Sequence, residues 1–145
     1  MLCDISQVTS LGRRMHEESP IYSKNIFDPQ KVIHLLHHSL SIPQEMCVLI
    51  NVEDDVVNGG IIGISQENWY GPDREASDVA LFIHKDKRGG MLAARLIRAY
   101  ESWAKSIGAK VINLGVSTGI HVEKTTALYK RLGYDEPAYN LRKRI

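Results

Sequence analysis

The segment ALFIHKDKRGGMLAARLIRAYESWA, residues 80–104, joins an apolar run to a helical pattern and constrains the fold more than any other part of the chain. Beyond the join, apolar residues recur at the spacing of one helix face, at Leu92, Leu96, Ala99, Trp103 and Ile107. Gly108 then supplies a helix stop, and the strand-like run KVINLGVST follows it. A strand, a long helix and a second strand predict a crossover unit.

The chain before this segment predicts helices first and then a meander. Helical patterns occupy residues 5–19, closed by Pro20, and residues 29–40, where Asp28 offers an N-cap. Three apolar or β-branched runs follow, at residues 46–53, 59–70 and 77–84. Asn58-Gly59 is a hairpin-turn signal between the first two of these runs, which favours antiparallel pairing.

The chain after the crossover predicts a shorter helix and a last pair of strands. The helix lies in VEKTTALYKRLGY and ends at Gly133, and the strands lie in AYNLRKRI. This order of elements indicates a mixed α/β or α+β class. A length of 145 residues suits one domain over 1–145.

Composition limits the classes of function. A formal net charge of +1 gives no overall attraction to nucleic acid, so any cationic site must be local. Two cysteines, Cys3 and Cys47, are too few for a disulfide scaffold and are expected to be reduced. No apolar run approaches the roughly 20 residues of a membrane span, and the N-terminus lacks a signal-peptide pattern. We therefore expect a soluble, cytoplasmic protein without membrane partners.

The join itself has the chemistry of a phosphate site. The first turn of a helix leaves backbone N–H groups without intrahelical partners, and its dipole makes that end positive. Gly89 and Gly90 allow an anion to approach the backbone, and Lys87 and Arg88 add charge. A glycine-rich turn with solvated cations is the competing interpretation. The spacing fits neither a Walker A loop nor a dinucleotide-binding fingerprint.

Two motifs together resemble the GNAT superfamily of acetyl-CoA-dependent N-acetyltransferases. LFIHKDKRG, residues 81–89, is similar to the family's strand that leads into a pyrophosphate turn. ALYKRLGY, residues 127–134, is similar to its second signature and lies about 40 residues later. The resemblance implies a mixed, mostly antiparallel sheet flanked by helices, with acetyl-CoA as co-substrate.

The resemblance also implies where the cofactor binds. Residues 81–83 would hold the pantetheine arm, and the turn that Arg88 begins would hold the pyrophosphate; the set is Leu81, Phe82, Ile83, Arg88, Gly89, Gly90, Met91, Leu92 and Ala93. Met91 stands where the family pattern has glycine. The family's helix asparagine is missing here, and Thr118, His121 or Ser117 would take its place.

The same resemblance assigns the chemistry. Tyr129 would protonate the leaving thiolate, because a phenol is a donor that stays neutral near pH 7. Asp78 is the leading candidate for the general base, ahead of Glu75, while His84 is expected to lie on ordinary surface. An amine would attack the thioester directly, without a covalent enzyme intermediate, and a strand N–H around Ile83 would stabilise the oxyanion.

The acceptor is the least constrained part. Glu17, Tyr22, Trp69 and Tyr70 are expected in loops beside the acceptor cleft, where acidic and aromatic groups suit a small-molecule or peptide amine. No metal site is expected, since three helix histidines, His34, His37 and His38, lack an obvious partner.

One alternative function remains open. The chain would then be a weak or inactive GNAT-fold protein that binds acyl-CoA or a partner protein. A homodimer is possible in either case, because proteins of this family are often dimers.

Overall fold

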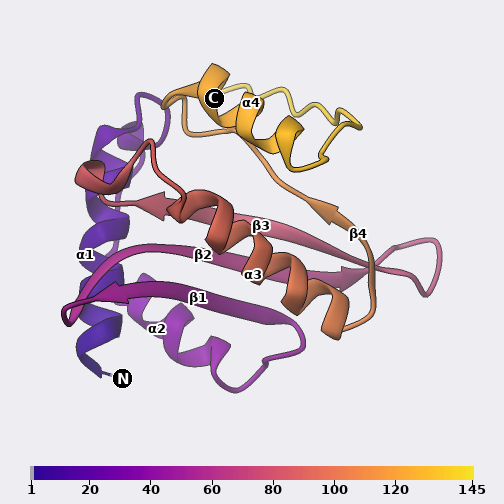
Figure 1. The fold of residues 1–145 in the computed structure, drawn as a ribbon, viewed down its shortest axis with the longest axis horizontal. Coiled ribbons are helices and arrows are strands. Elements are labelled where there is room, and N and C mark those ends of the chain that lie inside the picture. The colour runs from indigo at the N-terminus through magenta and orange to yellow at the C-terminus, as the bar shows by residue number, and fades with distance from the viewer. Residues whose placement is uncertain (1) are drawn as a thin grey trace.

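The computed structural model describes residues 2–145, with side chains from Asp4 onward. Figure 1 shows one twisted sheet with helices packed along it. The longer elements in chain order are α1 (Leu2–Glu18), α2 (Pro29–Ser39), β1 (Met46–Glu53), β2 (Val56–Glu67), β3 (Arg74–Ile83), α3 (Leu92–Ser106), β4 (Ala109–Asn113) and α4 (Val122–Arg131). Two short 3₁₀ helices, η1 (Tyr22–Lys24) and η2 (Lys85–Lys87), follow α1 and β3. None of the helices in residues 2–145 is long and apolar enough to cross a membrane.

The sheet confirms the expected mixed topology. Its order is β1-β2-β3-β4; the first three strands are antiparallel neighbours, and β4 lies parallel to β3. Helix α3 makes the crossover between β3 and β4 that the strand-helix-strand pattern predicts.

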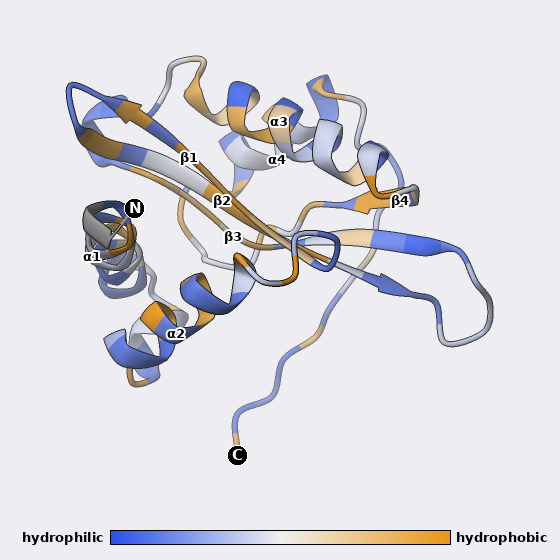
Figure 2. Ribbon diagram, turned by 90° about the horizontal axis from the view of Figure 1, so that it is seen from below, coloured by the Kyte–Doolittle hydropathy of each residue, from blue (hydrophilic) through white to orange (hydrophobic). Residues whose placement is uncertain are grey.

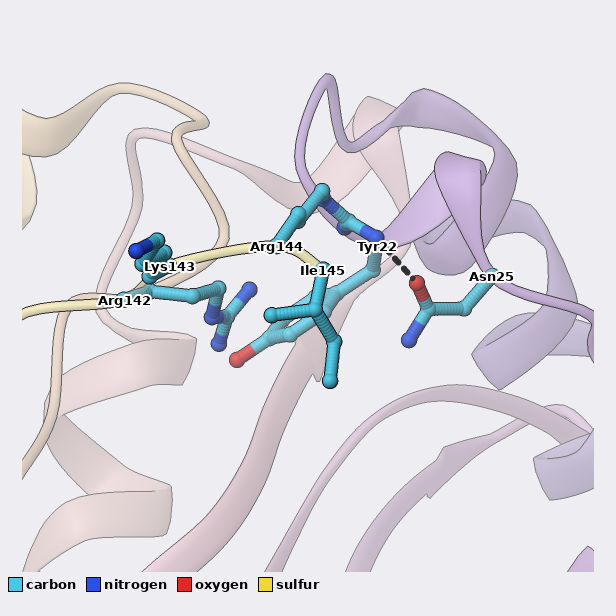
Figure 3. Close-up of a pocket in the computed structure, with 6 residues that line it drawn as sticks. All are labelled: Tyr22, Asn25, Arg142, Lys143, Arg144 and Ile145. Carbon is cyan, nitrogen blue, oxygen red and sulfur yellow. Dashed lines mark hydrogen bonds between the residues drawn. The ribbon is translucent and has the colours of Figure 1, made fainter.

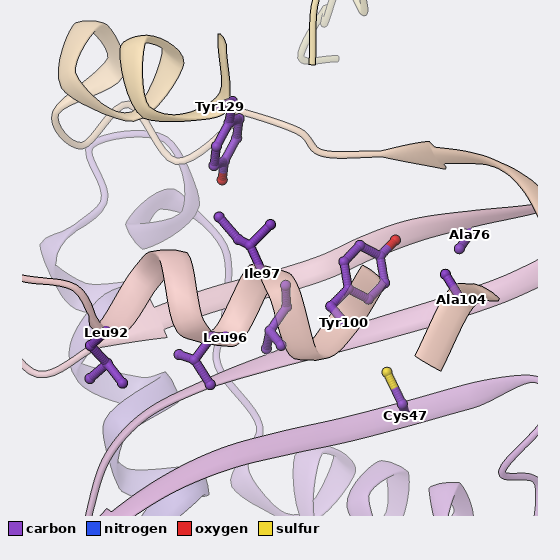
Figure 4. Packing of buried hydrophobic residues seen from close by; sticks show 9 residues of the cluster. Cys47, Ala76, Leu92, Leu96, Ile97, Tyr100, Ala104 and Tyr129 are labelled. Carbon is purple, nitrogen blue, oxygen red and sulfur yellow. The ribbon is translucent and has the colours of Figure 1, made fainter. Parts of the chain in front are cut away.

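Helices cover both faces of the sheet (Figure 2). On one face, α1 and α2 bury a cluster of Val8, Leu11, Leu36, Val57, Ile62 and Phe82. On the other, α3 and α4 bury a larger cluster, which includes Ile61, Leu96, Ile97, Tyr100 and Tyr129 (Figure 4). Tyr100 is fully buried at the centre of α3, whereas Ala99, expected on the buried face, is exposed. Buried aromatic surface of this size is a major source of stability.

The expected turn at Asn58-Gly59 is wrong. Both residues lie inside β2, and the hairpin turns at Asp54 and Asp55, which have positive φ angles of 50° and 60°. Gly59 has a different role: a Cβ there would meet the Leu92 side chain at 3.0 Å. Glycine in β2 therefore serves the close approach of α3, which a turn signal cannot reveal.

The end of the chain also differs from expectation. Strand β4 stops at Asn113, and residues 138–145 form no strand in the described structure. Helix α4 ends close to the predicted stop, with Gly133 at a φ of 97°. Cys47 is a free, buried thiol, as expected, while the Cys3 side chain lies outside the described part.

We expect Gly63→Ala to destabilise the protein by about 1–3 kcal/mol, the usual range for overpacking. A Cβ at Gly63 would lie 2.5 Å from the buried Tyr100 ring, which has no room to move. Gly71→Ala is the matched control, because nothing lies within 4 Å of a Cβ there. Urea denaturation measures both free energies of unfolding, and equal values would show that α3 does not depend on this close contact.

Candidate active site

A cleft opens where strands β3 and β4 separate. Their parallel register runs from Arg74 and Ala109 to Ser77 and Asn113 and then ends, while β3 continues to Ile83. Beyond that point no strand pairs with the outer edge of β3 in the described structure. The cleft has a volume of about 590 Å³ and is lined by β3, the loop after β4 and α4.

Leu81 and Ile83 present backbone groups to this open edge. The N–H of His84 donates to the Asn58 carbonyl of β2 at 2.8 Å. Backbone groups alternate sides along a strand, so those of Ile83 and Leu81 point away from β2 and towards the cleft, which both residues line. An extended molecule can pair with such an edge as an added strand does.

The turn into α3 offers unpaired N–H groups. Gly89 has a φ of 83°, and a Cβ on Gly90 would meet only the Lys87 carbonyl, at 3.9 Å. Within α3, the first N–H to find a backbone acceptor is that of Arg95, which donates to Met91 at 3.0 Å. For residues 89–93 the described structure shows no such acceptor. A positive helix end with open space and free N–H groups suits a phosphate.

Arg88 holds this turn in place by hydrogen bonds to α1 and β3. Its guanidinium donates to both carboxylate oxygens of Glu18 in α1, at 2.6 Å for the Nη2–Oε2 pair, and its Nε donates to the Ile83 carbonyl at 3.1 Å. The hydrogen bond from Arg88 lowers the pKa of Glu18. Arg88 lines the cleft as expected, but its donors fix the turn to α1 and β3. A bidentate pair of this kind is directional, so it also orients the turn.

Asp78 and Tyr129 both contact the backbone of Gly115. The Gly115 N–H donates to Asp78 Oδ1 at 2.8 Å, and the Tyr129 hydroxyl lies 3.5 Å from the Gly115 carbonyl. Burial raises the pKa of Asp78, which weakens its preference for the charged form. Burial, and then the nearby Asp78 carboxylate, raise the pKa of Tyr129, which keeps the phenol neutral. The cleft thus holds a proton acceptor and a proton donor side by side.

Ser19 joins the α1 side of the cleft to the loop after β4. Its buried hydroxyl donates to the Thr118 carbonyl and accepts the N–H of Tyr22 at 3.0 Å. The Tyr22 hydroxyl in turn bonds Ser117 Oγ. These contacts form a wall of the cleft that contains Tyr22, Ser117 and Thr118, with His121 beyond it at the start of α4.

Three of the four expected acceptor residues lie elsewhere. Trp69 and Tyr70 are 94% and 69% exposed at the tip of the β2–β3 hairpin, and neither lines the cleft. In Figure 1 this hairpin extends at the end of the sheet opposite to α1. Glu17 is exposed on α1 and, like them, is not among the cleft-lining residues. Only Tyr22 has the expected place. Strand β2 continues past Ile64, its last residue paired with β1, and this places the two aromatic side chains away from the cleft. Residue type alone could not predict this.

Other candidates are placed as follows. Phe82 is buried against α1 and α2, so its side chain faces away from the cleft. Glu75 accepts from Asn113 Nδ2 at 3.3 Å outside the cleft, and His84 caps η2. His34, His37 and His38 are exposed. Over the described residues, no group of histidines, cysteines or carboxylates has the arrangement of a metal site.

Glu18, Ser19 and Gly115 are site residues that the sequence did not single out. Each acts through a partner far along the chain: Glu18 through Arg88, Ser19 through Thr118, and Gly115 through Asp78 and Tyr129. No local spacing predicts such pairs.

The sequence is similar to those of known acetyltransferases. The sequence matches the family model described as "Acetyltransferase (GNAT) family" over residues 12–134. It is 25% identical to an IAA acetyltransferase of Azospirillum brasilense over 130 residues, covering 90% of this chain and 75% of that protein.

Solved structures share the fold. An aminoglycoside acetyltransferase from an uncultured soil metagenomic sample superposes with a TM-score of 0.72 at 21% identity, covering 97% of this chain and 91% of the other. AAC(6')-Iy, in complex with the bisubstrate analogue CoA-S-monomethyl-acetylneamine, gives a TM-score of 0.74 at 15% identity, covering 97% and 92%.

We expect Asp78→Asn to raise the free energy of unfolding at neutral pH. Folding raises the pKa of Asp78, so the ionised carboxylate lowers the free energy of unfolding of the wild-type protein at pH values above that pKa. This loss of stability disappears below the pKa of Asp78 in the unfolded chain, about 3.9, where the carboxyl is protonated in both the folded and the unfolded protein. The stability gain of the variant should therefore shrink as pH falls. Urea titrations at several pH values measure it, and a gain that grows on acidification would contradict the assignment.

Proposed function

This chain belongs to the GNAT family of acetyltransferases, and we propose that it transfers the acetyl group of acetyl-CoA to a primary amine by direct attack. The observation that carries the proposal is the meeting of Asp78 and Tyr129 at Gly115, where β3 and β4 separate. An acid and a base at one point of a cleft are what aminolysis of a thioester requires.

The cleft fits acetyl-CoA in shape and polarity. The edge of β3 offers the backbone groups of Leu81 and the N–H of Ile83 to the pantetheine amides, while the Ile83 carbonyl already accepts from Arg88. The N–H groups of residues 89–93 offer donors for the pyrophosphate. When bound there, acetyl-CoA supplies the activated acetyl group. AAC(6')-Iy bound to a CoA-linked acetylneamine analogue supports both the donor and an amine acceptor.

The proton steps follow from the environments of the two side chains. Asp78 accepts the proton that the amine loses as the new C–N bond forms, directly or through water. Its pKa is raised by burial, which makes it a stronger base than an exposed aspartate. Tyr129 donates its proton to the sulfur as the C–S bond breaks. Its raised pKa keeps the proton in place until a thiolate develops.

We propose an oxyanion donor nearer to Asp78 than the Ile83 N–H that the sequence suggested. The register of β2 and β3 shifts between Ile62 and Gly63, so Val79 has no partner on β2. This bulge adjoins Asp78, whereas Ile83 lies four residues beyond Val79, or about 13 Å along the strand. We therefore assign oxyanion stabilisation to the Val79 backbone, because bulges re-aim backbone groups beside active sites.

Binding of CoA should stabilise the protein by about 2.7 kcal/mol at a hundredfold excess over its Kd. Gly90→Asp should abolish this effect, because the added carboxylate repels phosphates in a turn that has room for the side chain. Gly71→Asp is the control, since it adds the same charge at an equally open position on the distant hairpin. Thermal melts with and without CoA measure the effect. No stabilisation of the wild-type protein would overturn the CoA site.

Tyr129→Phe should lower kcat by about 10²-fold and leave CoA binding unchanged. The ring is buried and keeps its packing, while its hydroxyl makes one long bond, to Gly115 at 3.5 Å. Tyr134→Phe is the matched control: it removes a hydroxyl that bonds Glu101 outside the cleft. Thiol release with an amine panel measures both variants.

Two results of that assay would change the proposal. Equal rates for wild type and Tyr129→Phe would remove the tyrosine from its role. CoA binding without thiol release from any amine would instead support a non-catalytic acyl-CoA-binding protein.

A further inference from the structure

The segment after α4 crosses to the opposite face of the sheet. In Figure 1 it runs back past α4 towards η1, and in Figure 2 it descends from the α3/α4 layer to the layer of α1 and α2. Arg144 ties it there, with Nη1 donating to Asn25 Oδ1 and Nη2 to the Ile21 carbonyl, each at 2.8 Å. Both partners lie in the loop between α1 and α2, which also carries Tyr22.

Arg142 lies directly on Tyr22. Its guanidinium carbon is 5.2 Å from the ring centroid, within the range of a cation–π contact. Figure 3 shows the Arg142 side chain extending beside the hydroxyl end of Tyr22. That hydroxyl bonds Ser117, which lines the active-site cleft. Arg142 therefore places a permanent positive charge at the rim of the cleft.

A second hollow lies beside the cleft around this arginine. It is lined by Tyr22, Asn25, Arg142, Lys143, Arg144 and Ile145 (Figure 3). Three of these side chains are cationic and none is a carboxylate, and within residues 2–145 none of the three cations is ion-paired with an acidic side chain. Tyr22 lines both spaces, so the hollow adjoins the cleft at this residue.

The loop after β4 connects the Asp78 carboxylate to the Tyr22–Arg142 contact. Ser117 lies two residues beyond Gly115, so their Cα atoms are at most about 7 Å apart. The Gly115 N–H donates to Asp78, and the Ser117 hydroxyl bonds the Tyr22 hydroxyl. The Arg142 guanidinium makes a cation–π contact with the same tyrosine. An acceptor whose amine lies at Asp78 and which extends along this loop would meet the Arg142 guanidinium beside Tyr22.

The charges in the cleft do not favour a polycationic acceptor. Asp78 is the one carboxylate among the described residues that line it, and Glu18 nearby is already paired with Arg88. The wall beside Asp78 consists instead of hydroxyl groups, from Ser117, Thr118 and Tyr22, and ends at a guanidinium. Hydroxyl groups and a guanidinium are donors that bind carboxylate or phosphate oxygens.

We propose that the acceptor is a small primary amine that also carries a carboxylate or a phosphate, and that Arg142 binds this anionic group. Arg144 is the positioning residue that holds the segment against the α1–α2 loop. The inference rests on the proposed acetyl transfer, and it assigns the acceptor class at the same cleft.

Binding to the CoA-saturated protein tests the anionic site without turnover. Ethanolamine, phosphoethanolamine and β-alanine form a matched set of probes: they share a short amine and differ in the second group. We expect phosphoethanolamine, β-alanine or both to raise the melting temperature more than ethanolamine at equal concentration. The two anionic probes distinguish a phosphate from a carboxylate acceptor. Equal shifts with all three probes would overturn the proposal.

Variants test the two arginines. Arg142→Gln should weaken binding of the preferred anionic amine about tenfold, the lower range for loss of a charge-assisted bond, and leave ethanolamine unaffected. Arg142→Lys should restore part of the loss, because the charge remains. Arg144→Gln should reduce binding in the same direction. Lys105→Gln, an exposed cation at the end of α3, is the control and should change nothing. Unchanged affinity in Arg142→Gln would overturn the assignment.

Thiol release separates failure of this inference from failure of the enzymatic function. If anionic amines are acetylated with a KM that rises about tenfold in Arg142→Gln at unchanged kcat, both proposals stand. If neutral or polycationic amines are acetylated preferentially, the function stands and the acceptor class is wrong. If anionic amines bind through Arg142 but no amine releases thiol, the anionic site stands and acetyl transfer fails.

Discussion

The early separation of β3 and β4 is the constraint on which the rest of the structure depends. A parallel pair that ends at Ser77 and Asn113 leaves the outer edge of β3 without a strand partner. Unpaired backbone groups are costly when buried, so such an edge either stays open to solvent or binds a molecule of matching polarity. The Asp78 carboxylate accepts the Gly115 N–H at 2.8 Å. This bond joins β3 to the segment after β4 at the point where the pairing of the two strands ends. One hydrogen bond thus defines the apex of the cleft and positions a catalytic candidate.

Close packing of α3 on the sheet determines where the turn of residues 88–93 lies. Gly59 and Gly63 of β2 let Leu92 and Tyr100 approach the strand more closely than a side chain would allow. A helix held at this distance cannot shift without opening the core, because protein interiors are close-packed. The turn that precedes it is then fixed against α1 by Arg88 and Glu18. These contacts therefore link the α3 end of the cleft to its α1 side.

Local patterns identified most elements, and the errors share a cause. The bounds of β1 and the N-cap of α2 at Asp28 are confirmed, because an apolar, β-branched run and a capping side chain are properties of a few neighbouring residues. Asn58-Gly59 was misassigned because a glycine that admits a helix and a glycine that makes a turn look alike in sequence. Residues 138–145 were expected as strands, but Arg142 and Arg144 bind the α1–α2 loop instead.

The sequence by itself determined the crossover unit, the turn of residues 88–93 and the presence of Tyr129 in the second motif, because each is a short pattern with its own periodicity or backbone requirement. Only the tertiary structure decided which side chains share a cleft. Asp78 contacts Gly115 across a sequence separation of 37 residues, Ser19 contacts Thr118 across 99, and Arg144 contacts Ile21 across 123. Contacts at such separations depend on how helices and strands pack, and packing is a property of the whole chain rather than of any segment.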